Sequence, residues 1–149
     1  MRMDEFVMRG QTPSGETEVL NFSGFKPGYG YKLIEFQLYN STNIGTTEPE
    51  MCGSITAGKT AVDPKAPDFN DEGLIATATF KDHNNAAYGL RELSVINDTF
   101  IITQNLILKV QDTASAATPV NWQCKFKPVK MSKAEEAVTN YKQFLISDD

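Results

Sequence analysis

The sequence predicts an all-β fold, an antiparallel β-sandwich that ends in one amphipathic helix. Three observations lead to this fold class. Short segments alternate apolar and polar side chains, as half-buried strands do. Turn-forming residues separate these segments at intervals of about 8–12 residues, a spacing that favours a sandwich or barrel over β-α-β units. Near the C-terminal end the apolar period changes from two to about 3.6, which is the period of a helix.

The first half of the chain contains five predicted strands. They cover residues 4–9, 14–25, 29–41, 51–57 and 74–80. The clearest is 29–41, in which Ile34, Phe36 and Leu38 share one face and Tyr39 points to the other. Two prolines and several acids make 63–73 a long surface loop.

The second half predicts four more segments with strand character. They cover residues 90–96, 99–104, 105–112 and 120–127. In the last of them Val120, Trp122, Cys124 and Phe126 point one way, and polar side chains alternate with them. This pattern predicts a strand with one buried and one solvated face.

The C-terminal helix is predicted over residues 131–147. Ser132 is a suitable N-cap, and Glu135 completes the capping-box pattern three residues later. Six apolar side chains follow the helical period. They are Ala134, Ala137, Val138, Tyr141, Phe144 and Leu145. An isolated helix of this length is marginal in water, so the stripe is expected to cover an end or open face of the sandwich, or to dock on another subunit. Residues 1–130 and the helix together form one predicted domain, 1–149.

Composition excludes several classes of protein. The 149 residues carry 14 Lys and Arg against 19 Asp and Glu, a net charge of -5, which argues against a general nucleic-acid binder. Nine Phe and five Tyr are enough for a core. The longest apolar runs are too short to span a membrane, and the charged N-terminus does not resemble a signal peptide. We therefore expect a protein made and folded in a reducing cytosol.

Residues 53–60, GSITAGKT, match the phosphate-loop pattern GxxxxGK[ST]. A working nucleotide site needs a buried strand before the loop and a helix after it. Here the preceding segment is polar, and Pro64 and Pro67 prevent a helix of useful length. We interpret the string as a strand that turns at Gly58 and Lys59, and predict no nucleotide site.

The acidic loop places Asp68, Asn70, Glu72 and Gly73 at the first positions of a calcium-loop pattern. Position 12 would be Thr79, not the bidentate Glu of that pattern, and the flanking segments are not helical. A solvated acidic loop is the favoured interpretation, and calcium bound by a non-helical loop is the alternative.

The remaining reactive side chains form no recognisable catalytic set. His83 is the only histidine and lies beside Asp82 in an Asn-rich loop, where no nucleophile motif accompanies it. Cys52 and Cys124 are best explained as two buried small residues, with a disulfide as the alternative. We therefore predict no catalytic, cofactor-binding or metal-binding residues, and no enzyme.

Two surface features are candidates for binding. The first is a cluster of lysines near the last strand, which either protects an edge or a wet face, or meets an acidic partner or an anionic polymer. It consists of Lys125, Lys127, Lys130 and Lys133. The second is a set of tyrosines, Tyr29, Tyr31 and Tyr39, which share a parity along one strand. Such a row either stacks on sugars or packs in the core.

The last third of the chain, roughly residues 99–149, resembles the C-termini of small virion proteins of marine bacterial viruses. The resemblance rests on the strands NLILKVQD and VNWQCKFKPVK, the loop that contains TPVNW, and the terminal helix MSKAEEAVTNYKQFLISDD. It implies a jelly-roll-like sandwich that acts as a capsid or capsid-associated subunit, without catalysis and without a cofactor. No functional residue is carried over, because the resemblance is one of pattern and spacing.

The expected function is thus that of a non-enzymatic structural subunit of a bacteriophage virion, made in the host cytoplasm. The expected partners are further copies of the chain and other virion proteins, with neither a membrane nor a nucleotide. Direct contact with nucleic acid is not expected, because the chain is acidic. The alternative is a carbohydrate- or ligand-binding sandwich module that uses the tyrosine-bearing strand and the acidic loop.

Overall fold

The computed structural model describes residues 5–22, 27–43, 47–58, 60–82, 90–115 and 117–148. Eight strands and one helix follow one another along these residues. They are β1 (Phe6–Thr12), β2 (Thr17–Leu20), β3 (Tyr29–Asn40), β4 (Glu50–Ala57), β5 (Leu74–Asp82), β6 (Leu90–Ile96), β7 (Leu106–Asp112), β8 (Val120–Lys130) and α1 (Lys133–Asp148).

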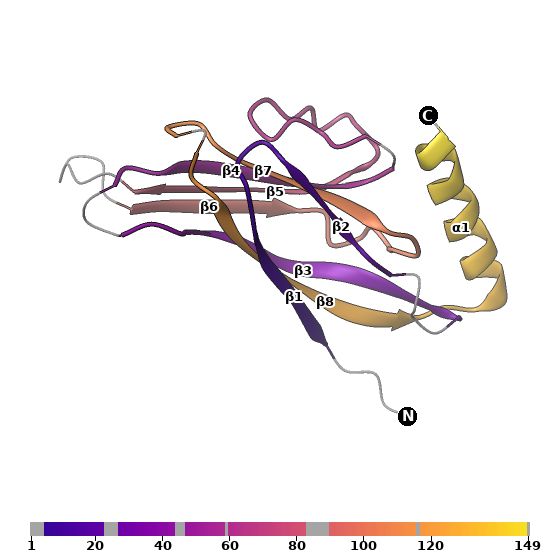
Figure 1. The fold of residues 1–149 in the computed structure, drawn as a ribbon. Helices are drawn as coiled ribbons and strands as arrows, with labels where there is room; N and C mark the ends of the chain where they lie inside the picture. Colours follow the sequence, from indigo (N-terminus) through magenta and orange to yellow (C-terminus); the bar gives the residue numbers. More distant parts are fainter. Residues whose placement is uncertain are drawn as a thin grey trace.

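The strands form two antiparallel sheets that pack face to face, with α1 at one end (Figure 1). The smaller sheet has the order β1-β8-β3, and the larger has the order β2-β7-β4-β5-β6. The predicted antiparallel sandwich with one C-terminal helix is therefore confirmed.

The strand order is jelly-roll-like, because strands pair in a nested way from the two ends of the chain. β1 pairs with β8, β2 with β7, and β4 with β5, all antiparallel. The remaining nested pair would be β3 with β6, but β6 stays beside β5 in the larger sheet. Folding a long hairpin back on itself produces this nesting, which is the architecture of jelly rolls.

The core lies between the sheets, and β8 contributes to it by alternation of buried and polar side chains. In β8, Val120, Trp122, Cys124 and Phe126 are buried, as the sequence predicts. Phe126 stacks on Phe6, with ring centroids 5.4 Å apart. The rings of Phe126 and Phe22 meet edge to face, with centroids 5.0 Å apart. Such aromatic pairs add to the stabilisation that comes from burial alone.

A β-bulge in β3 changes which side chains face the core. The register against β8 shifts between Leu33 and Glu35. Tyr31 and Leu33 are therefore buried before the bulge, and Phe36 is buried after it. The sequence placed Ile34 with Phe36 on one face, and this part of the prediction is wrong because a bulge inserts one residue and reverses the parity.

The predicted strand over residues 99–104 is also wrong. Its structure is a single bridge, in which the backbone N–H and C=O of Ile102 pair with Tyr31 at 2.7 and 2.9 Å. The chain passes at this point from the edge of the larger sheet to the edge of β3 and back to β7. Ile102 is fully buried there, which explains the apolar pattern of the segment without a strand.

The acidic loop covers the outer face of β4. The Ser54 hydroxyl donates a hydrogen bond to the carbonyl of Val62 at 2.6 Å. The N–H of Val62 in turn donates to the Thr56 hydroxyl at 3.1 Å. Both faces of β4 are thus covered, which explains why the strand is buried along nearly its whole length.

Candidate interaction surface

Helix α1 begins at Lys133, directly after the predicted N-cap Ser132 and two residues later than the start of the predicted range 131–147. The Ser132 hydroxyl accepts a hydrogen bond from the N–H of Glu135 at 3.2 Å. The N–H of Glu136 donates to the carbonyl of Ser132 at 2.9 Å. This N-cap satisfies backbone donors that would otherwise lack partners in the first turn, so Ser132 sets the start of the helix.

One polar side chain, Gln143, anchors α1 to the sandwich. Gln143 is buried. Its amide oxygen accepts a hydrogen bond from the N–H of Thr103 at 3.0 Å, and its amide nitrogen donates to the carbonyl of Ile101. These two backbone groups flank Ile102, whose own polar groups pair with Tyr31 on the opposite side. The Gln143 amide therefore takes the place that a neighbouring strand would occupy.

The end of α1 packs on two glycines of the larger sheet's loops. A Cβ atom at Gly58 or at Gly73 would lie 3.4 or 3.2 Å from Cγ2 of Ile146. Their missing side chains thus let Ile146 approach closely. Together with Gln143, this contact fixes which side of α1 faces the sandwich.

The apolar stripe of α1 faces away from the sandwich. We call Val138, Tyr141, Phe144 and Leu145 the outer stripe. These side chains are 47–63% exposed. Gln143 is two residues from both Tyr141 and Leu145, and two residues correspond to about 200° around a helix. The anchoring contact and the outer stripe therefore lie on opposite sides of α1.

The sequence left two positions for the stripe, and the structure contradicts the first, in which the stripe covers the sandwich. The helix does stand at one end of the sandwich (Figure 1), but it meets its own chain through Gln143 and Ile146. Helices on globular proteins normally turn the apolar side inward. The outward orientation leaves the stripe uncovered by the rest of the described chain.

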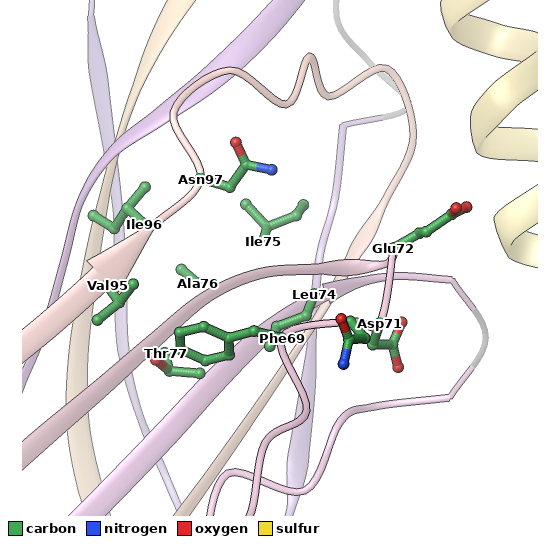
Figure 2. A pocket seen from close by; sticks show the side chains of 11 residues that line it. Phe69, Asp71, Glu72, Leu74, Ile75, Ala76, Thr77, Val95, Ile96 and Asn97 are labelled. Atoms are coloured by element: carbon green, nitrogen blue, oxygen red, sulfur yellow. The ribbon is translucent and has the colours of Figure 1, made fainter.

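A second exposed apolar surface lies on the outer face of β5 and β6. We call it the β5–β6 groove. Its floor carries Thr77 and Thr79, which are the register partners of Val95 and Leu93. Phe69 of the acidic loop forms the opposite wall, and Phe69, Leu93 and Val95 are 44–66% exposed. Figure 2 shows Phe69 over β5 near Thr77, with Val95 on the neighbouring strand.

Two hollows follow each other along this groove. One, of about 290 Å³, lies between Phe69 and Val95 and has Asp71 and Glu72 at its end. The other, of about 720 Å³, lies beside Leu93. Its charged lining residues are Lys65, Lys81 and Arg91 together with Glu50 and Glu92, and Lys81 pairs with Glu50 at 3.5 Å. The groove thus has one acidic end and one end of mixed charge.

The predicted lysine cluster lies on the outer face of the smaller sheet and at the start of α1. Lys125 pairs with Glu5 at 3.4 Å. Lys127 is exposed and lies opposite Lys32 in the β3 register. Lys130 and Lys133 are also exposed. The acidic loop instead covers the outer face of the larger sheet, so the two charge clusters lie on different sides of the molecule.

The phosphate-loop string does not form a phosphate loop in the described residues. Gly53 lies within β4, where a Cβ atom would be only 3.1 Å from the Phe36 ring. Residues 60–73, which follow the string, contain turns and no helix; Lys59 lies outside the described residues. The interpretation of 53–57 as a strand is confirmed.

Substitution of Gly53 tests this packing. Gly53→Val should lower the free energy of unfolding by about 1–3 kcal/mol, because the new methyl groups overpack Phe36 and Leu38. Denaturant titration measures the change in the free energy of unfolding. Val62→Ala, in the loop that covers the outer face of β4, is the comparison variant. A Gly53→Val protein as stable as wild type would contradict the packing.

The acidic loop adopts turns that its own side chains stabilise. The Asp68 carboxylate accepts a hydrogen bond from the N–H of Asn70, and the Asp71 carboxylate accepts one from the N–H of Gly73, both at 2.9 Å. Thr79, the twelfth position of the calcium pattern, lies within β5. In the described part of the chain no three His, Cys, Asp or Glu side chains come together as a metal site. His83 lies outside the described residues.

The tyrosines do not form a row. Tyr31 is buried and Tyr39 is half exposed, on opposite sides of the bulge. The Tyr39 and Phe80 rings meet edge to face, with centroids 5.2 Å apart. The shared parity that the sequence suggested for a sugar-binding platform is therefore wrong.

Both cysteines are buried and free. Cys124 lies in the core, and Cys52 lies on the outer face of β4 under the acidic loop. Burial raises the pKa of the Cys124 thiol. Burial, together with the Asp63 carboxylate, raises the pKa of the Cys52 thiol to about 11. The interpretation as two buried small residues is confirmed.

These raised pKa values predict slow thiol chemistry. Because only the thiolate reacts, an aromatic disulfide reagent at about pH 8, near the pKa of an ordinary cysteine, should label native protein slowly. Full labelling of both thiols should follow addition of denaturant. Rapid native labelling of Cys52 would contradict its placement under the loop.

Comparison of the chain with protein-family models, with curated proteins and with solved structures finds no match. Among the described residues, no helix is both long enough and apolar enough to cross a membrane.

Proposed function

We propose that this chain is a non-enzymatic structural subunit of a bacteriophage virion, which assembles with further copies of itself into a capsid or attaches to one. The observation that carries the proposal is the outer stripe of α1. Four large apolar side chains are 47–63% exposed on one side of a helix whose other side is anchored through Gln143.

Contact of this stripe with water is unfavourable in free energy unless another molecule covers the stripe. Completing the burial of four half-exposed apolar side chains would contribute roughly 3–6 kcal/mol per copy, before the cost of association is subtracted. The bonds from Gln143 to the backbone of residues 101 and 103 hold α1 so that the stripe points outward. Contiguous apolar surface of this kind marks protein interaction sites.

The strand order supports the same proposal. The nested pairs β1 with β8, β2 with β7 and β4 with β5 are those of a jelly roll, an architecture that serves both capsid subunits and lectin domains. The resemblance of the C-terminal third to small virion proteins favours the capsid-type use. The proposed location of the chain is the virion, after synthesis in the host cytoplasm. Its proposed partners are other copies of the chain and other virion proteins.

The size of the assemblies that the chain forms, and its incorporation into virus particles, test this proposal. The purified chain should form a defined oligomer in size-exclusion chromatography with light scattering, or ordered particles in electron micrographs. Expressed together with the other structural proteins of its genome, it should be found in the assembled particles. A strict monomer that never joins particles or other virion proteins would contradict the proposal.

A carbohydrate- or ligand-binding module is the second candidate function, and the β5–β6 groove is the observation that favours it. The hollow beside Leu93, of about 720 Å³, is large enough for a small ligand. Lys81 and Arg91 at its rim would orient polar groups. A glycan array with and without Ca²⁺ tests this function, and the absence of binding to every glycan would count against it.

A further inference from the structure

We propose that the outer face of the smaller sheet binds a neutral saccharide in a hollow near the start of β8. The hollow has a volume of about 320 Å³, and small-molecule sites typically have about 300–1,000 Å³. We call it the amide hollow. Its polar lining residues are Arg9, Gln37, Tyr39, Glu92, Asn121 and Gln123. This inference goes beyond the proposed assembly and does not depend on it.

The strand register brings these side chains together from distant parts of the sequence. β8 lies between β1 and β3. Gln123 of β8 pairs with Arg9 on one side and with Gln37 on the other. Two residues earlier in β8, Asn121 pairs with Tyr39. Residues two apart on a strand point to the same face, so the two rows lie next to each other on the solvent side of the sheet.

Three carboxamides line the hollow, and one of them is held in place by hydrogen bonds. The amide oxygen of Asn121 accepts a hydrogen bond from the Gln11 side chain at 2.9 Å. Its amide nitrogen donates to the carbonyl of Asn40 at 3.3 Å. A carboxamide both donates and accepts hydrogen bonds, and so does a sugar hydroxyl. The neighbouring amides of Gln123 and Gln37 can therefore bind adjacent hydroxyls in either sense.

Tyr39 adds an exposed aromatic ring beside these amides. Its side chain is 52% exposed, and the edge-to-face contact with the buried Phe80 ring supports it from below. A supported ring provides a large contact area at a low cost in conformational entropy, and its electron-rich face attracts C–H groups. A pyranose has C–H groups on its faces and hydroxyls at its rim, which matches one ring flanked by carboxamides.

The charges around the hollow favour a neutral ligand. The charged residues that line it are Arg9 and Glu92, which carry one positive and one negative charge. Lys125, in the next row of β8, pairs with Glu5 at 3.4 Å. Nucleic acids and other anionic polymers bind where cations are in excess, and here the charges balance. Arginine and glutamate can both hydrogen-bond to sugar hydroxyls.

The amide hollow lies far from the outer stripe of α1. Gln123 precedes Lys130, the last residue of β8, by seven positions, which is about 24 Å at 3.4 Å per residue. Helix α1 follows directly at Lys133, at the other end of the sheet (Figure 1). Saccharide binding and assembly through the outer stripe therefore use different parts of the chain, and one does not exclude the other.

Trp122 provides a built-in reporter for this site. It is the only tryptophan of the chain, and it lines the hollow from within β8. A glycan array should identify neutral glycans that bind wild type. Calorimetry with those glycans should give a saturable isotherm, and the Trp122 emission should change in parallel. The absence of binding to every neutral glycan would overturn the inference and leave the proposed assembly standing.

Tyr39→Ala should weaken the binding of such a glycan by roughly tenfold or more, because it removes the stacking ring. Tyr39→Phe, which keeps the ring, should retain most of the affinity. Tyr141→Ala is the matched control, since Tyr141 is 63% exposed on α1, and it should bind as wild type does. Circular dichroism and thermal unfolding establish that each variant folds. Wild-type affinity in Tyr39→Ala, or an equal loss in Tyr141→Ala, would overturn the inference.

Gln37→Leu tests the amides, because it removes one carboxamide at nearly constant size. It should also weaken glycan binding by roughly tenfold. Leu93→Ala, which changes the wall of the β5–β6 groove, should leave the affinity unchanged. Loss of binding in Leu93→Ala but not in Gln37→Leu would place the saccharide in that groove and overturn the inference. Binding of a short oligonucleotide in place of every glycan would overturn the assignment to a saccharide.

Discussion

Phe126→Ala should lower the free energy of unfolding by about 3–5 kcal/mol, the cost of removing a large aromatic side chain from a packed core. Phe126 is fully buried, and its ring contacts both Phe6 and Phe22. These rings join β1 to β8 and fill the space between the sheets. A loss of this size is a large fraction of the stability of a typical domain.

Phe144→Ala is the matched control for this prediction. The residue type and the substitution are the same, but Phe144 is 57% exposed on α1. Its effect should stay within about 0.5 kcal/mol in a dilute, monomeric sample. Denaturant titration with two spectroscopic probes measures both variants. Similar losses at the two positions would show that α1 packs with its stripe inward, which contradicts the structure.

Gln143→Leu should release α1 from the sandwich. The substitution keeps the approximate size of the side chain, but it leaves the N–H of Thr103 and the carbonyl of Ile101 without their partner. Each buried backbone group that loses its hydrogen bond costs about 1–3 kcal/mol. Because α1 without its anchor is too short to persist alone in water, the cost should appear as local unfolding of the helix.

Amide hydrogen exchange measures this release. In Gln143→Leu, exchange should accelerate through residues 133–148 and at residues 101–103, while the strands of the smaller sheet remain protected. Asn140→Leu, at an exposed position of the same helix, should leave exchange near the wild-type rate. Unchanged exchange in Gln143→Leu would mean that α1 is held by other contacts.

Much of the sandwich could be predicted from the sequence, because most strands alternate with a period of two. The alternation of β8 identified Trp122, Cys124 and Phe126 as core residues, and the structure buries all three. In β3 the same reasoning assigned Ile34, in place of Leu33, to the buried face before the bulge. The bulge depends on the pairing of β3 with β8, whose partner residues at the bulge lie about 90 positions away in the sequence, so no local pattern reveals it.

For the helix too, local sequence patterns predicted some features, whereas contacts between residues distant in the sequence decided others. Its start at Ser132 and its apolar stripe follow from capping and period, and both are present. The direction in which the stripe points could not be predicted, because the contact of Gln143 with residues 101 and 103 decides it. The β5–β6 groove was missed for a similar reason, since the loop residue Phe69 and Val95 of β6 line the same hollow only in the folded chain.

The central claim is that this chain assembles through the outer stripe of α1. Sedimentation velocity over a wide range of concentrations tests it most directly, with wild type compared with the Tyr141→Asp and Phe144→Asp double variant. Wild type should shift to larger species as concentration rises, and the equally folded variant should sediment as a monomer over the same range. Identical sedimentation of the two proteins, whether as monomers or as oligomers, would contradict the claim.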